Sequence, residues 1–308
     1  MRALVIGGTG FIGRRLVEYL IKYDCEVTIA TSGKTPNPFK DEVASIVFDR
    51  FSEESIESKL SSPPFFDVVF DNLAFRRDDV VKMSNFFEGR IGRYVFISSA
   101  AVYEGLSGIL KENQFDPMKF KIIKNRKETS YSEGKRNVEA YLFQEAGFEV
   151  LAARFPNVLG HDDSTKRFQG HVSKILDEHR IAIPANEGRR NYAWVDDCGR
   201  FLAWIGLHGK KGVYNGASPD AITVRELSRK IANIAGVDVR LEEPDKNEEL
   251  SDYYNRVDYI LSTEKANGVN FSFTGMEDWL REEVNAYMQT GGKLKNSAEY
   301  RKYLFCSL

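Results

Sequence analysis

Tyr131 and Lys135 are the residues of this sequence with the clearest chemical use, because they lie four positions apart near the start of an expected helix. That spacing places both side chains on one helix face. A tyrosine, whose ordinary pKa is about 10, exchanges protons near neutral pH only when its phenolate is stabilised. An adjacent ammonium group favours the phenolate. The pair predicts a general acid and base, and an ordinary surface pair is the alternative that the spacing alone leaves open.

Ser99 is a third polar residue with a chemical use, because it directly follows a strand expected over residues 94–98. The carboxyl ends of parallel strands are where ligands bind in open α/β sheets. A hydroxyl group there can hydrogen-bond a reacting oxygen or share its proton. A serine that only caps the strand end is the alternative.

Gly7, Gly10 and Gly13 indicate a bound dinucleotide. They directly follow a short apolar run with the spacing G-x-x-G-x-x-G, and an amphipathic helix is expected after them. In such a loop the first glycine permits a tight turn, the second admits a pyrophosphate, and the third lets the helix pack on the strand. The N–H groups and the dipole at the helix start favour phosphate. A plain turn is the alternative, and the second strand expected over residues 26–30 speaks against it.

Apolar runs and helical patterns alternate through the first half of the chain, which predicts an α/β fold. Several runs are continuous, as in strands that are buried on both faces of a parallel sheet. The alternation predicts a Rossmann-type doubly wound parallel sheet with right-handed crossovers. Strands are expected over residues 3–6, 26–30, 45–48, 68–71, 94–98 and 149–154, and helices over residues 14–23, 54–60, 78–87 and 133–144.

The alternation of strands and helices ends half-way along the chain, which predicts a second, smaller lobe. We expect a dinucleotide-binding domain over residues 1–160 with 190–216, and a smaller C-terminal substrate lobe over residues 161–189 with 217–290. Such a lobe would cover the strand ends where ligands bind. The remaining tail is polar with late aromatic residues. A docking helix and an oligomer contact, such as that of a homodimer, both stay open for it.

Composition narrows the classes of function. The 308 residues are 42% hydrophobic, which is enough for a sizeable core. A formal net charge of -2 gives no electrostatic reason to expect nucleic acid or an acidic membrane as the main partner. Three cysteines and four histidines show no ligand spacing, so they predict neither a metal site nor disulfides. We expect a cytoplasmic protein, because the first apolar run is typical of a strand rather than a signal peptide and no run is long enough to span a membrane.

Further motifs follow in order along the chain, and together they resemble a known family. With the glycine loop, Ser99 and the Tyr-x-x-x-Lys pair, they resemble the extended short-chain dehydrogenase/reductases, which include NAD(P)-dependent sugar-nucleotide epimerases and dehydratases. The resemblance covers about residues 1–285. The further motifs are Asp-Val-Val-Phe at residues 67–70, Asn-Leu-Ala at residues 72–74, Arg-Phe-Pro-Asn-Val-Leu-Gly at residues 154–160 and Arg-Asn-Tyr-Ala-Trp-Val-Asp-Asp at residues 190–197.

The resemblance implies a role for each matching residue. Tyr131 would be the general acid and base, Lys135 would lower its pKa and hold the cofactor ribose, and Ser99 would hydrogen-bond the reacting oxygen. Asn157 and Arg190 would bind a nucleotide-sugar substrate, Arg190 through the diphosphate. The implied cofactor-binding residues are Gly7, Gly10, Phe11, Ile12, Gly13, Thr31, Ser32, Lys34, Asp49, Asn72, Leu73, Ala74, Lys135 and Phe155.

Two departures from the family pattern narrow the chemistry. Related 4,6-dehydratases and sugar-acid decarboxylases carry acidic residues just after the serine position, where this chain has Ala100 and Ala101. An epimerase or a simple reductase needs no such acid. The second strand ends in Thr-Ser-Gly-Lys at residues 31–34, with no carboxylate that would repel a 2′-phosphate, which favours NADP slightly over NAD. The arginine that many NADP-dependent relatives carry nearby is missing, so NAD stays open.

Two other functions stay open for this fold. Some relatives, including chloroplast RNA-binding proteins, bind RNA rather than sugars. Residues 70–72 and the basic segment over residues 119–136 would suit that function. Other atypical relatives are cofactor-sensing regulators, for which a damaged Tyr-x-x-x-Lys motif is expected. The intact set of Ser99, Tyr131 and Lys135 favours an enzyme over both.

Overall fold

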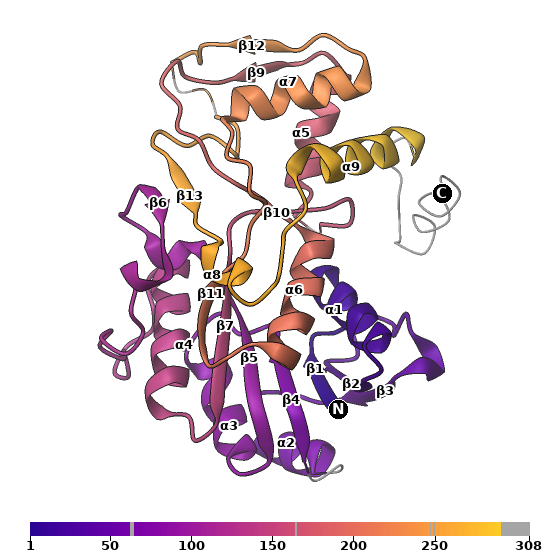
Figure 1. The fold of residues 1–308 in the computed structure, drawn as a ribbon, viewed down its shortest axis with the longest axis vertical. Helices are drawn as coiled ribbons and strands as arrows, with labels where there is room; N and C mark the ends of the chain where they lie inside the picture. The colour runs from indigo at the N-terminus through magenta and orange to yellow at the C-terminus, as the bar shows by residue number, and fades with distance from the viewer. Residues whose placement is uncertain (62–64, 164, 247, 249, 291–308) are drawn as a thin grey trace.

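A parallel sheet forms the larger part of the molecule (Figure 1). The computed structural model describes residues 1–61, 65–163, 165–246, 248 and 250–290. The strands of the sheet are β1 (Arg2–Ile6), β2 (Glu26–Thr31), β3 (Ala44–Val47), β4 (Phe66–Asp71), β5 (Ile91–Ser99), β7 (Glu149–Phe155) and β11 (Gly212–Asn215). They pair in parallel in the order β11-β7-β5-β4-β1-β2-β3. The order reverses between β1 and β4, so the predicted Rossmann-type doubly wound sheet is confirmed.

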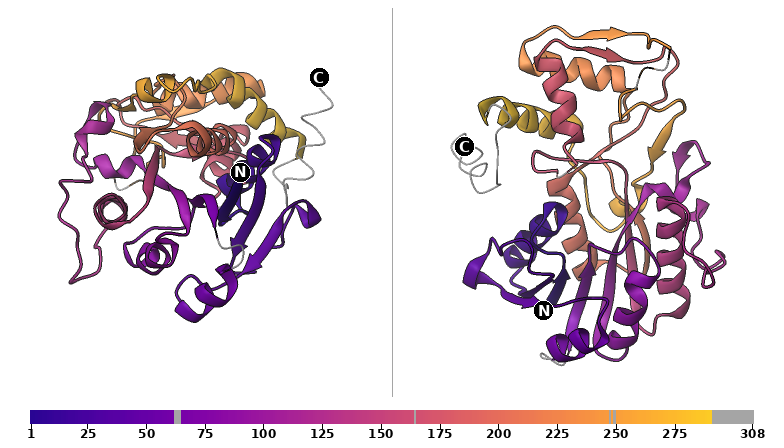
Figure 2. Two further views of the ribbon diagram at one scale, coloured as in Figure 1. Left: turned by 60° about the horizontal axis from the view of Figure 1, so that its bottom comes forward. Right: turned by 180° about the vertical axis from the view of Figure 1, so that it is seen from behind.

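Helices cover both faces of this sheet (Figure 2). α1 (Phe11–Lys22) and α6 (Val195–His208) lie on one face. α2 (Glu53–Leu60), α3 (Asp78–Phe87) and α4 (Tyr131–Glu145) lie on the other. The sheet is therefore buried on both faces, which is why its strands read as continuous apolar runs.

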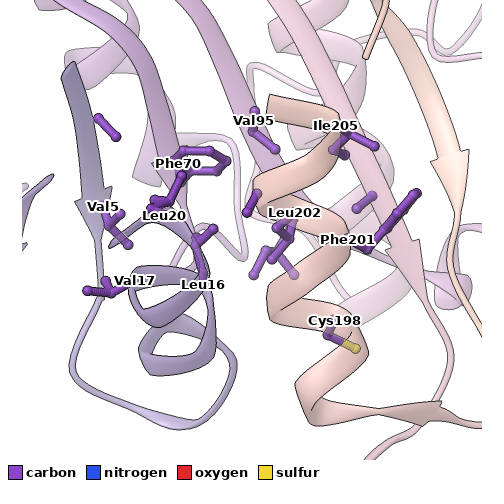
Figure 3. Close-up of a cluster of buried hydrophobic side chains, with 14 of the residues drawn as sticks. Val5, Leu16, Val17, Leu20, Phe70, Val95, Cys198, Phe201, Leu202 and Ile205 are labelled. Carbon is purple, nitrogen blue, oxygen red and sulfur yellow. The ribbon is translucent and has the colours of Figure 1, made fainter. Parts of the chain in front are cut away.

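Side chains that alternate along each strand fill two separate cores. Val5 of β1 and Phe70 of β4 pack with Leu16 of α1 and Phe201 of α6 (Figure 3). The neighbouring positions on the same strands, such as Leu4, pack toward α2, α3 and α4 instead. This follows from the period of two in a strand, which sends successive side chains to opposite faces.

Two helices begin earlier than apolar periodicity indicates. α1 begins at Phe11, directly after its N-cap Gly10. α4 begins at Tyr131 because the side chain of Ser130 accepts a hydrogen bond from the backbone N–H of Glu133. Capping depends on polar residues, which a search for apolar periodicity passes over. The earlier start puts both Tyr131 and Lys135 within the first turns of α4.

A second group of elements packs around its own core, at the top of Figure 1. It contains the helices α5 (Arg167–Leu176), α7 (Val224–Ala235) and α9 (Met276–Thr290), and the parallel pair β9 (Arg180–Ala182) and β12 (Arg240–Glu242). We call this group the lobe. Its buried side chains include Phe168, Val172, Leu227, Trp279 and Leu280. The domain boundaries given above remain predictions.

Short strand pairs connect the lobe with the sheet domain. β13 (Tyr259–Leu261) pairs with β6 (Gly108–Leu110), and β10 (Ala193–Trp194) pairs with β8 (Val158–Leu159). The remaining short elements are the 3₁₀ helices η1 (Lys40–Glu42), η2 (Ala100–Tyr103) and η3 (Glu112–Gln114), and the helix α8 (Glu264–Asn267). The tail expected to dock or to contact another copy, residues 291–308, lies outside the described residues. In the part of the chain that the structure describes, no helix is both long enough and apolar enough to cross a membrane.

We predict that Gly13→Ala destabilises the fold, because a Cβ atom there would lie 2.0 Å from the carbonyl oxygen of Gly7. The free energy of unfolding should fall by at least about 3 kcal/mol. Gly170→Ala in α5 is the control, because nothing lies within 4 Å of its Cβ position. Alanine favours the helix, so the free energy of unfolding should rise by about 0.5–1 kcal/mol. Urea unfolding measures both changes. Equal stability of the two variants would contradict the close packing of α1 on β1.

Candidate active site

The glycine loop has the geometry of a phosphate-binding turn. Gly7 has a φ of +83°, which L-residues with side chains rarely adopt. Its Cβ position is 2.7 Å from the side chain of Leu73, so the loop after β4 lies directly beside it. The Cβ position of Gly10 instead has no atom within 4 Å. Gly10 therefore borders open space, whereas Gly7 and Gly13 are required for turning and packing.

The start of α1 carries uncapped backbone donors at this open space. The N-cap is Gly10, which has no side chain to accept from the first N–H groups, and the first turn contains no acidic residue. These donors and the helix dipole fit a diphosphate group. Phe11 and Ile12 are half-buried at the same place, and the ring of Phe11 is 3.0 Å from the Cβ position of Gly160. The loop thus fits the dinucleotide that the sequence predicts.

The ends of β2 and β3 provide further exposed groups beside this loop. The Thr31 hydroxyl accepts a hydrogen bond from the N–H of Gly33 at 3.1 Å, which holds the turn. Ser32 and Lys34 are exposed. Asp49 is also exposed, and its carboxylate accepts a bond from the N–H of Phe51 at 2.9 Å. Ser32, Lys34 and Asp49 therefore remain accessible to a ligand, while Thr31 serves the turn.

Arg50, which the sequence interpretation did not single out, forms a buried ion pair under the cofactor loop. Its guanidinium donates to both carboxylate oxygens of Asp71, at 2.7 and 3.2 Å, and to the carbonyl of Asp79 at 2.6 Å. The Tyr94 hydroxyl and the N–H of Leu73 also donate to Asp71. Burial alone would raise the pKa of Asp71, but the Arg50 charge and these hydrogen bonds outweigh it and lower the pKa. The ionised carboxylate of Asp71 therefore stabilises the turn that follows β4.

That turn brings Asn72, Leu73 and Ala74 against the glycine loop. The Asn72 amide nitrogen donates to the carbonyl of Gly7 at 3.3 Å. Its amide oxygen is buried and accepts no hydrogen bond from the described residues. Ala74 is fully buried, and its carbonyl accepts from the ammonium of Lys135 at 2.8 Å. The turn thus connects the dinucleotide loop to the predicted catalytic lysine.

Lys135 lies with 2% of its surface exposed, beneath Tyr131. Its ammonium donates to the carbonyls of Ala74 and Ile97, both at 2.8 Å, and lies 4.7 Å from the ring centre of Phe96. Burial lowers the pKa of Lys135 to about 8. The ring of Tyr131 lies 5.8 Å from the same ammonium. The structure therefore brings the two residues together as the four-residue spacing predicts.

Tyr131 is 51% exposed, and the Ser99 hydroxyl lies near its phenol. Partial burial raises the pKa of Tyr131, whereas the Ser99 hydroxyl and the nearby charge of Arg167 oppose that rise. Ser99 ends β5 and also accepts from the N–H of Ala101 at 3.1 Å. The Ser-Tyr-Lys set is assembled at the carboxyl edge of the sheet, with an exposed phenol as its outermost group.

A second buried ion pair lies behind Ser99. The guanidinium of Arg154 pairs with the carboxylate of Glu139 at 2.5 Å, and both side chains are fully buried. The neighbouring Ser98 donates to the same carboxylate. Arg154 also bonds the Tyr103 hydroxyl at 2.8 Å. These contacts fix β5, β7 and α4 relative to one another at the level of the site.

The remaining predicted residues lie on the side of the site toward the lobe. Phe155 pairs in register with Ser99, is 2% exposed, and packs against the ring of Phe201. Asn157 is half-buried, and its backbone carbonyl accepts from Ala193 at 3.1 Å. Phe155 is thus part of the core beside the site, and only part of its edge is available to a ligand.

Arg190 is a half-buried cation with spare hydrogen-bonding capacity. One guanidinium nitrogen donates to the carbonyl of Tyr253 at 3.3 Å, and its Nε is buried without a partner among the described residues. The guanidinium also lies 5.7 Å from the ring centre of Tyr192. A buried donor of a charged group that has no partner is costly, so the site suits an anionic ligand.

Comparison with known proteins identifies the family. Residues 3–75 and 78–217 match the NAD dependent epimerase/dehydratase family. The chain belongs to this family. Solved structures show the same fold. The UDP-glucose 4-epimerase of Thermotoga maritima, solved with UDP-glucose, is 19% identical, with a TM-score of 0.73 over 94% of this chain and 99% of that one.

Two further structures of epimerase and dehydratase enzymes are similar. The UDP-glucose 4-epimerase of Thermus thermophilus, in complex with NAD, is 21% identical with a TM-score of 0.69, over 92% of this chain and 98% of that one. The dTDP-glucose 4,6-dehydratase of Bacillus anthracis, in complex with NAD, is 18% identical with a TM-score of 0.72. The match covers 96% of this chain and 99% of that one. At these identities the likeness shows the fold alone.

One curated relative is named for binding stem-loops rather than for an enzyme activity. It is the chloroplast stem-loop binding protein of 41 kDa b from Arabidopsis thaliana, which is 30% identical over 115 residues. The match covers 33% of this chain and 30% of the length of that protein. Within the described residues, no group of three or more His, Cys, Asp and Glu side chains could hold a metal ion.

We predict that Gly10→Ala folds normally but binds NAD at least about tenfold more weakly, because the new methyl group enters the open space at the start of α1. Calorimetric titration with NAD, beside thermal unfolding, measures both properties. Gly170→Ala should leave NAD binding unchanged. Unaltered NAD affinity in Gly10→Ala would show that the phosphates bind elsewhere.

Proposed function

We propose that this family member is an NAD(P)-dependent epimerase or reductase of a nucleotide sugar, with Tyr131 as its general acid and base. The observation that carries the proposal is the exposed Tyr131 ring, 5.8 Å from the buried Lys135 ammonium, with Ser99 near its phenol. The family match supports the use of a nicotinamide cofactor. The similar structures solved with NAD or with UDP-glucose support both ligand classes.

In the proposed reaction, Tyr131 takes the proton from a sugar hydroxyl group while Ser99 holds the same oxygen by a hydrogen bond. The nicotinamide cofactor, which the glycine loop and Lys135 would hold, would supply reversible hydride transfer to and from the carbon that carries this hydroxyl. Tyr131 then returns the proton to the oxygen. Because the proton and hydride are both returned, an epimerisation has no net redox change.

Lys135 is placed to hold position and charge rather than to exchange the proton itself. Two of its three donors are engaged by the carbonyls of Ala74 and Ile97, which leaves one for a ribose hydroxyl. The Ser99 hydroxyl and the Arg167 charge favour the Tyr131 phenolate. A cationic nicotinamide would favour it further.

The residues after Ser99 limit the chemistry. Ala100 and Ala101 begin the 3₁₀ helix η2, and neither carries a group that can donate or accept a proton. Elimination of water and decarboxylation each need an additional acid or base near the sugar. Epimerisation or simple reduction therefore fits these positions better than the dehydratase or decarboxylase reactions.

The nucleotide part of the substrate is assigned to the lobe side of the site. Arg190 offers a partly buried guanidinium whose Nε has no partner among the described residues. A diphosphate supplies the acceptors that this group lacks. Asn157 lies on the segment that follows β7 and is half-buried, in keeping with a contact to the sugar.

For the cofactor, we propose a slight preference for NADP over NAD. Ser32 and Lys34 are exposed beside the glycine loop, and no carboxylate occurs at residues 31–34. Arg50 lies nearby, but Asp71 and Asp79 occupy its donors, so it does not replace the missing phosphate-binding arginine. The preference thus depends on Lys34, whose exposed charge is screened by solvent.

Binding of RNA, the alternative function, has less support. Three cations of the basic segment over residues 119–136 are paired with carboxylates: Lys119 with Asp116, Lys124 with Glu145, and Arg126 with Glu133. Asp71, at the centre of residues 70–72, is fully buried. In the described part of that segment, Lys121 and Lys127 are the exposed cations left without a carboxylate partner, which is a small set for a phosphate backbone. The partial match to a stem-loop binding protein keeps filter binding to RNA a useful control.

We predict that Tyr131→Phe lowers turnover of the sugar by about two to four orders of magnitude, because the acid-base hydroxyl is lost while the ring remains. The unmodified enzyme should oxidise faster as the pH rises through the pKa of Tyr131, since the phenolate is the base, and Tyr131→Phe should lose that rise. Absorbance of the reduced nicotinamide measures both. Tyr23→Phe, at the end of α1, is the matched control. Undiminished turnover by Tyr131→Phe would reject the proposed role.

We predict that Lys34→Glu weakens NADP binding by roughly threefold to tenfold and spares NAD, because a carboxylate repels the 2′-phosphate at an exposed, screened position. Calorimetry with each cofactor measures the change. Lys59→Glu, on α2, is the control for net charge. If the unmodified protein binds NAD more tightly than NADP, the proposed preference is wrong, whereas the Tyr131 assignment is unaffected.

A further inference from the structure

Phe75 is a half-exposed aromatic residue that no step of the proposed reaction uses. It follows Ala74 in the turn after β4, and 50% of its surface is exposed. Its backbone N–H donates to the carboxylate of Asp79 at 2.7 Å, and the N–H of Arg76 donates to the same oxygen at 2.9 Å. The carbonyl oxygen of Phe75 lies 2.5 Å from the Cβ position of Gly134, so α4 packs closely against it. The backbone that carries the Phe75 ring is therefore held by both the turn and the helix.

The ring of Phe75 lies over the Lys135 ammonium. The ammonium nitrogen is 4.9 Å from the centre of the Phe75 ring and 4.7 Å from the centre of the Phe96 ring. Phe96 belongs to β5 and is fully buried. The Tyr131 ring lies 5.8 Å from the same nitrogen, and its centre is 6.1 Å from that of Phe75. Three aromatic rings, from β5, α4 and the turn after β4, thus surround one charge.

Burial of apolar surface does not explain an aromatic ring at this position. A ring that stays half exposed gains only part of the free energy that full burial would give. The face of an aromatic ring, however, carries partial negative charge and attracts a cation within about 6 Å. Two N–H groups of the Lys135 ammonium donate to the carbonyls of Ala74 and Ile97, and a ring face attracts the charge without occupying the third. The Phe75 ring therefore suits a cation that must stay charged with little water around it.

The charge of Lys135 is marginal near neutral pH. Burial is the largest influence on it and lowers the pKa of Lys135 to about 8. The carboxylates of Asp71, Glu139 and Asp79 favour the charged form. Arg50, which pairs with Asp71, opposes it. At such a pKa, a modest further attraction decides how much of the protein carries an ammonium group there.

We propose that Phe75 is a positioning residue, whose ring keeps the Lys135 ammonium charged and in place beside Tyr131. This inference rests on the proposed function, in which that ammonium is the partner of the Tyr131 phenol. The attraction of the ring favours the charged form of Lys135, so its loss lowers the pKa further, and the ammonium then gives up its proton at a lower pH. A ring that only fills space has no such effect.

The test is an NMR titration of the full chain with isotope-labelled lysine side chains, in the absence of sugar and cofactor. The signal that disappears in Lys135→Arg identifies Lys135. Trifluorophenylalanine is then put in place of Phe75, because its fluorine atoms withdraw the negative charge from the ring face and keep the shape of the ring. The pKa of Lys135 should fall by about half a pH unit to one pH unit.

Two further variants control for packing and for the modified amino acid. Phe75→Tyr keeps a negatively charged ring face and should titrate as the unmodified protein does. Trifluorophenylalanine in place of Phe65 makes the same replacement at another exposed phenylalanine, directly before β4 and at the opposite end of that strand from the site. It should leave the titration of Lys135 unaltered. Thermal unfolding shows that each variant is folded.

The outcomes separate this inference from the proposed function. An unaltered titration with trifluorophenylalanine at position 75, or an equal fall with it at position 65, overturns the role of Phe75. A fall confined to position 75 supports that role. Because the titration needs neither sugar nor cofactor, it does not depend on turnover. Undiminished turnover by Tyr131→Phe would reject the proposed function and would leave Phe75 as a stabiliser of the ammonium alone.

Discussion

The burial of one ammonium group holds the candidate site together. Lys135 carries its charge into the protein, where it has lost its water, and the carbonyls of Ala74 and Ile97 replace that water. These carbonyls come from the turn after β4 and from the end of β5, whereas the lysine belongs to α4. The ammonium therefore sets the distance between the helix that carries Tyr131 and the two strand ends that border the glycine loop. Moving any of the three would leave a buried charge without acceptors.

Two buried ion pairs surround this contact and make the same region rigid. Arg50 and Asp71 brace the turn after β4, and Arg154 and Glu139 join β7 to α4. Breaking a buried pair by removing one partner typically costs about 3–5 kcal/mol, because the other charge is left buried and unpaired. The proposed transfer of a proton and a hydride needs this rigidity, because its reacting atoms must keep a fixed geometry.

The site is composed of two parts of the chain that are far apart in sequence. The proposed acid-base set and the glycine loop belong to the sheet domain, whereas Arg190 belongs to a segment that connects the sheet domain with the lobe. The Tyr259 hydroxyl of β13 donates to the carbonyl of Ala100, next to Ser99. This bond couples the lobe directly to the strand end where Ser99 lies.

The sequence by itself determined what depends on local spacing. The turn at Gly7, the close packing at Gly13 and the shared helix face of Tyr131 and Lys135 follow from backbone geometry over a few residues. The alternation of apolar runs determined the doubly wound sheet for the same reason. Only the tertiary structure decided which charges meet. Arg50 meets Asp71, and the Lys135 ammonium meets the carbonyl of Ala74, through contacts between separate segments that leave no periodic signal in the sequence. Their energies also depend on burial, which exists only after the chain has folded.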